Sequence, residues 1–181
     1  MVAVGGTATD PVVLCRRQVA LVKPGISKQP YHAAAGMDLQ DAERFLRHCK
    51  GMARTLAQTG VRETKAELAA QGFQPVGCAV LLSSGRPTGE LAATLASHPA
   101  IHTAEGEFYR EALRHGAESC AIPVTGFKER DIAALGAANL GMAEDELQRR
   151  IAAFGKAIGP PWRQDEKLAT LAAWLVLAAL A

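Results

Sequence analysis

The most regular hydrophobic pattern in the chain predicts a long helix over residues 38–60. Apolar residues recur there every three or four positions, which places them along one face of a helix. Asp38 is suited to cap the beginning of this helix, and Gly60 to end it in a left-handed conformation. A shorter polar helix is expected over residues 62–71, ending at Gly72. The apolar positions of the long helix are Leu39, Ala42, Phe45, Leu46, Cys49, Met52, Ala53 and Leu56.

The middle of the chain changes to an alternation of short apolar runs and helical patterns. A continuous apolar run over 76–82 reads as a strand buried on both faces. Helices are expected over 88–97 and 107–117, and further strands over 100–105 and 120–125. Strands separated by helices at this spacing favour parallel pairing with right-handed crossovers.

The two ends complete the predicted fold. Residues 1–10 read as a flexible lead-in, 11–23 as one or two strands, and 24–37 as a loop. The C-terminal third has helical spacing, and its last helix begins at Gln164 or Asp165. We therefore predict a single α/β domain over 11–181, with a small, largely parallel or mixed sheet of four or five strands flanked by helices.

Composition narrows the functional classes. Apolar residues make up 49% of the 181 residues, charged residues 21%, and the formal net charge is +2. This balance argues against a disordered chain and gives no electrostatic support for binding nucleic acid or an anionic membrane. No two of the four cysteines form a CxxC pair, and three of them lie in apolar runs. This is expected of buried thiols in a protein of the reducing cytosol.

The last predicted helix is apolar, so it could span a membrane, form part of the core or contact a partner. It is apolar for about fourteen residues, from Leu168 to Ala181, against the roughly twenty that span a bilayer. The N-terminus lacks the basic and apolar regions of a signal peptide. We therefore expect a cytoplasmic protein in which this helix is either a core element or the interface of a homodimer.

Polar segments follow each of the three predicted parallel strands, at 83–86, 105–107 and 125–128. Ligands of open α/β sheets gather beyond the carboxyl ends of such strands, so these segments are candidates for one site. The first segment could bind an anionic small molecule, because its polar groups precede a predicted helix, although a capped turn explains these residues equally well. The residues proposed to bind this substrate are Ser83, Ser84, Arg86 and Thr88.

The densest cluster of potential metal ligands lies between residues 98 and 107. As a helix, this segment would place His98, His102 and Glu105 on one face, a workable set of ligands for a divalent metal. As a strand ending at Glu105, it would present that carboxylate at the sheet edge, and Gly106 would permit a tight turn. The strand is favoured, because an interior Gly106 costs a helix about 1 kcal/mol.

These residues also have a purely structural interpretation. Glu105 and Glu107 could complement the dipole of a helix beginning nearby, and His102 could hydrogen-bond the backbone. The functional interpretation is a small metal-assisted hydrolase, with Glu105 and His102 as candidate catalytic residues. The alternative from another class is a non-catalytic protein that binds a small ligand or forms homo-oligomers.

Overall fold

The computed structural model describes residues 1–83 and 89–180, which form two compact units. The first unit contains Met1–Gln18, Thr64–Leu82 and Ile122–Ala181. The second unit contains Val19–Glu63 and Ser83–Ala121.

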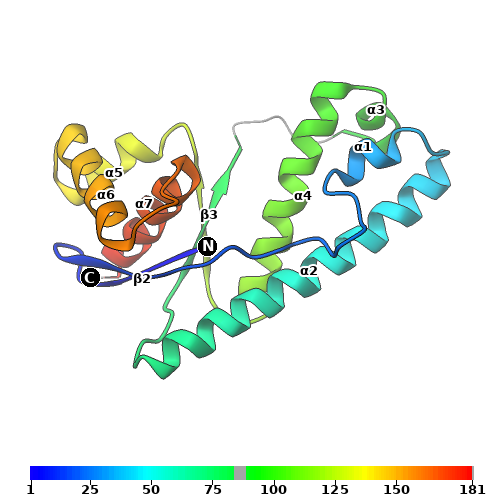
Figure 1. The fold of residues 1–181 in the computed structure, drawn as a ribbon. Coiled ribbons are helices and arrows are strands. Elements are labelled where there is room, and N and C mark those ends of the chain that lie inside the picture. Colours follow the sequence, from blue (N-terminus) through cyan, green and yellow to red (C-terminus); the bar gives the residue numbers. More distant parts are fainter. Residues whose placement is uncertain (84–88, 181) are drawn as a thin grey trace. The chain divides into compact units, whose positions relative to one another are not determined.

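The first unit contains two separate two-stranded sheets (Figure 1). Strands β1 (Val2–Gly6) and β2 (Pro11–Arg16) pair antiparallel. A strand therefore lies within residues 1–10, where the sequence predicts a flexible lead-in. Strands β3 (Cys78–Leu82) and β4 (Val124–Lys128) pair in parallel, with Cys78 opposite Val124 and Leu82 opposite Lys128. The prediction of one sheet of four or five strands is therefore wrong among the described residues.

Three helices form the core of the first unit together with these strands. They are α5 (Ile132–Leu140), α6 (Glu144–Ile158) and α7 (Gln164–Ala178). Helix α7 packs against β1, β3 and α5, and its Trp174 is fully buried. The Trp174 indole nitrogen donates a hydrogen bond of 2.8 Å to the carbonyl of Ala8. The apolar last helix is thus a core element, and the homodimer through it stays a prediction.

The second unit is helical. It contains α1 (Pro30–Ala34), residues 39–63 of α2 (Leu39–Ala70), α3 (Leu91–Leu95) and α4 (His98–Glu118). Helices α2 and α4 pack against each other (Figure 1). The buried side chains of this contact are mostly small. A Cβ atom at Gly116 would lie 2.8 Å from the carbonyl carbon of Ala57, so the two backbones approach closely here. The buried residues of this contact are Cys49, Ala53, Ala57, Phe108 and Ala112.

Helix α2 continues through Gly60, where the sequence predicts an end. A Cβ atom at position 60 would lie 2.5 Å from a methyl carbon of Val19, so the missing side chain makes room for that contact. Packing of this kind offsets the poor helix propensity of glycine, which amounts to about 1 kcal/mol. The helices predicted over 38–60 and 62–71 are consequently one helix of 32 residues.

The prediction of a strand over 100–105 is also wrong, because these residues lie in α4. Pro99 occupies the first turn of this helix, where no backbone N–H is needed. Ile101, Ala104 and Phe108 fall on one face and are buried. Burying one large apolar side chain contributes about 1.5–3 kcal/mol, which exceeds the cost of Gly106 in the helix. The middle strand of the predicted parallel sheet is thereby lost.

Within the described residues, no helix is both long enough and apolar enough to cross a membrane.

Candidate metal centre

Three histidines of the second unit converge on one point. His98 and His102 lie one turn apart near the beginning of α4, and His32 comes from α1. One ring nitrogen from each of the three lies within 4.8 Å of those of the other two. The ring centroids are 4.5 Å apart for His98 and His102, 4.8 Å for His32 and His102, and 5.3 Å for His32 and His98.

The spacing of two of these nitrogens matches that of ligands on one metal ion. Nε2 of His98 and Nε2 of His102 are 3.1 Å apart. Two imidazole nitrogens bound to zinc at ~2.05 Å with a tetrahedral angle would be about 3.3 Å apart.

Glu105 stands behind His32. Its Oε1 accepts a hydrogen bond from Nδ1 of His32 at 3.0 Å and another from the His32 backbone N–H at 3.2 Å. The residue is only 7% exposed. When Nδ1 carries the donated proton, the lone pair lies on Nε2, which is the arrangement that a metal-binding histidine requires. Glu105 therefore contacts a candidate ligand, His32, whereas the sequence predicts Glu105 itself as a ligand.

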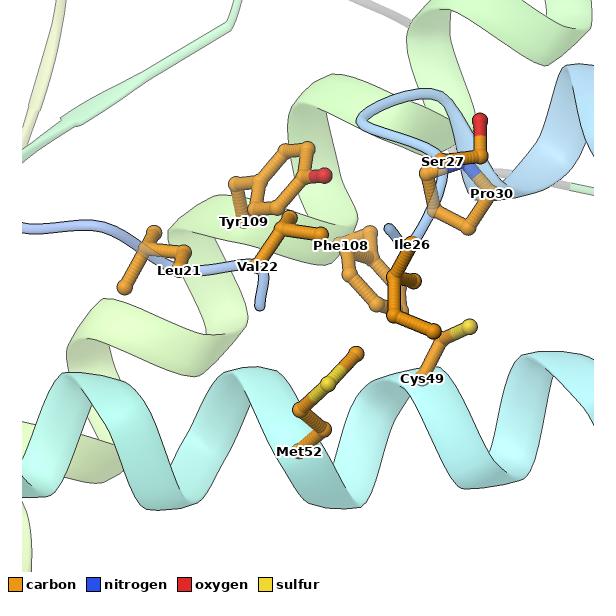
Figure 2. A pocket seen from close by; sticks show the side chains of 9 residues that line it. All are labelled: Leu21, Val22, Ile26, Ser27, Pro30, Cys49, Met52, Phe108 and Tyr109. Carbon is orange, nitrogen blue, oxygen red and sulfur yellow. The ribbon is translucent and has the colours of Figure 1, made fainter. Parts of the chain in front are cut away.

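The segment before α1 fixes the position of His32. Figure 2 shows side chains of this segment, among them Leu21, Val22 and Ile26, packed between α2 and α4. The pocket that they share has no room for a water molecule, so the segment is tightly seated. The hydroxyl of Tyr109 donates a hydrogen bond of 2.7 Å to the carbonyl of Lys28. This hydrogen bond fastens the segment just before α1 to α4.

The pKa values of two side chains of this pocket, Tyr109 and Cys49, are raised. Burial, together with the negative charge of Glu105, raises the pKa of Tyr109, so the phenol stays protonated and able to donate. Burial raises the pKa of the Cys49 thiol. Cys49 is thus a neutral packing residue, as the sequence predicts.

The outer side of the histidine cluster is open to solvent. His98 and His102 are exposed, and the His32 side chain is 27% exposed. Structural zinc sites usually have four protein ligands, whereas catalytic sites have three and keep one position for water or substrate. Three histidines with an open side have the donor number of the second type.

The structure brings together two of the three predicted metal ligands, His98 and His102, and adds His32 as a candidate that the sequence did not indicate. His32 precedes Glu105 by 73 positions, so no local spacing relates it to α4. Pro30 at the start of α1 is a helix-initiation signal, but it says nothing about what that helix faces.

The predicted substrate-binding segment does not add to this cluster. Ser83 follows β3 and is half-buried, and the histidine cluster is built from α1 and α4 without it. Ser84, Arg86 and Thr88 lie outside the described residues. The predicted segment over 125–128 belongs to β4, in the first unit.

Comparisons of this chain with protein-family models, with curated proteins and with solved structures gave no match.

Proposed function

We propose that the chain binds a divalent transition metal at His32, His98 and His102 and uses it to hydrolyse a small anionic substrate. The observation that carries the proposal is the convergence of three ring nitrogens within 4.8 Å, from two separate helices, in front of a buried carboxylate. Carboxylate, histidine and metal in series is a common arrangement of zinc sites. Zinc is the first candidate, because three imidazoles suit it and tetrahedral geometry needs one more ligand.

Each residue has a distinct role in this proposal. The three imidazoles hold the ion, and Glu105 keeps the ring of His32 oriented through its hydrogen bond to Nδ1. When bound, such an ion polarises the substrate and lowers the pKa of water at its open position to about 7. In the net reaction, the water oxygen bonds to the electrophilic atom of the substrate, the bond to the leaving group breaks, and the leaving group takes the proton.

A zinc titration of the full chain, after treatment with a chelator, tests the proposal. Isothermal titration calorimetry should show one zinc ion per chain, and alanine variants of His32, His98 and His102 should each weaken binding by at least about tenfold. His48→Ala is the matched control, since His48 is exposed on α2. Cobalt(II) in place of zinc should give the visible absorption of a tetrahedral site.

Two results would contradict the proposal. The 3.1 Å distance between His98 and His102 also suits a hydrogen bond between two neutral imidazoles. Absence of stoichiometric metal binding would favour that explanation and refute the metal site. Tight binding without metal-dependent hydrolysis of nitrophenyl phosphates or esters would refute the hydrolase and leave a non-catalytic metal site that fastens α1 to α4.

A further inference from the structure

A row of four residues, spaced by four positions, runs along α4 from the histidine cluster. The row consists of His98, His102, Gly106 and Arg110. Residues four apart are neighbours on a helix surface, so each side chain of this row lies beside the next. Gly106 interrupts the row because it has no side chain, although glycine is poorly suited to a helix interior. The row therefore contains a notch directly beside His102.

The guanidinium of Arg110 occupies this notch. A Cβ atom at Gly106 would lie 2.6 Å from Nη1 of Arg110 and 3.5 Å from its Cζ. Side chains on a helix lean toward its N-terminus, which explains why Arg110 reaches back over Gly106. Its charged end is consequently at the position next to His102, about one helical turn, or ~5.4 Å, along the axis.

We propose that Arg110 binds a phosphate group of the substrate while the same group contacts the metal held by His32, His98 and His102. This inference rests on the metal site of the proposed function. A bound metal ion and the guanidinium would lie on one row of α4, whereas the buried carboxylate of Glu105 is directed at His32. A phosphate between the two cations would contact both of them.

The chemistry of the guanidinium favours phosphate over carboxylate. Its fork of N–H groups takes two oxygens at ~2.8 Å, and a phosphate still has a third oxygen for a metal at ~2.1 Å. A carboxylate has only two oxygens and cannot satisfy both partners in this way. The predicted substrates are therefore phosphate esters.

Gly106→Ala provides a sharp test, because its effects on stability and on binding should have opposite signs. Alanine should raise the melting temperature, since it favours the helix and meets only the flexible end of Arg110. The same methyl group should displace the guanidinium and weaken binding of inorganic phosphate to the zinc-loaded full chain by about tenfold. Zinc affinity should not change. Gly51→Ala is the matched control, because nothing lies within 4 Å of its Cβ position in α2.

Calorimetry with inorganic phosphate, with acetate and with Arg110→Lys completes the test. Lysine keeps the charge but loses the fork, so it should also weaken phosphate binding. If zinc binds but Gly106→Ala and Arg110→Lys bind phosphate as the wild type does, the role of Arg110 is refuted and the metal site stands. If acetate binds as tightly as phosphate, the substrate class is wrong. If zinc does not bind, both proposals fall.

Discussion

Replacing Glu105 with glutamine tests how far the site depends on the carboxylate behind it. Glutamine has almost the same shape and keeps a carbonyl oxygen that can accept the hydrogen bonds from the His32 backbone and ring. The substitution removes the negative charge, which lies 3.0 Å from Nδ1 of His32. Glu105 is only 7% exposed. The substitution therefore isolates the electrostatic part of the contact.

The expected loss is between tenfold and a hundredfold in zinc affinity, the range for groups that orient a metal ligand. At 1.4 kcal/mol for each factor of ten, this corresponds to about 1.4–2.8 kcal/mol. Competition with a chromophoric chelator at neutral pH measures such a change directly. Circular dichroism of both proteins without metal checks that the helices are intact.

Glu107→Gln is the matched control, because Glu107 is an exposed carboxylate on the same helix. Glu107→Gln changes the net charge by the same amount as Glu105→Gln. The carboxylate that accepts the hydrogen bonds of His32 is that of Glu105. An equal loss in both variants would mean that the overall charge of the helix matters, and that the contact with His32 does not. Glu105→Gln binding zinc within about twofold of the wild type would refute the positioning role outright.

Two further predictions concern the packing of α4 against α2. Gly116→Ala should destabilise the protein by about 1–3 kcal/mol, because the new Cβ would lie 2.8 Å from the backbone of Ala57, which cannot move aside. Urea denaturation measures this, and a stability equal to that of the wild type would contradict the close approach. Burial favours the neutral form of Glu111, but hydrogen bonds from Arg54 and the charges around it outweigh burial and lower the pKa of Glu111. A lowered pKa contributes stability above its ordinary value of 4.5 that is lost as the pH falls through the lowered value. The wild type should therefore be more stable than Glu111→Gln near neutral pH and lose this advantage in acid; a constant difference across the titration would disprove the linkage.

The sequence by itself determined the features that depend on neighbours along the chain. The apolar stripe of α2 and the helical C-terminal third follow from spacing at helical period. The pairing of His98 and His102 is equally local, because residues four apart share a helix face wherever that helix lies. Local periodicity was compatible with either a helix or a strand over residues 98–105. The low helix propensity of Gly106 favoured the strand, but these residues form a helix.

Tertiary structure decided what local spacing cannot express. Gly60 and Gly106 lie inside helices because packing outweighs a propensity of about 1 kcal/mol, and packing partners are distant in sequence. His32 joins the cluster because the segment before α1 is packed between α2 and α4. The contact between α1 and α4 also makes Glu105, which the sequence predicts as a metal ligand, a hydrogen-bond partner of His32. Helical period places two histidines side by side, and only the folded second unit supplies the third.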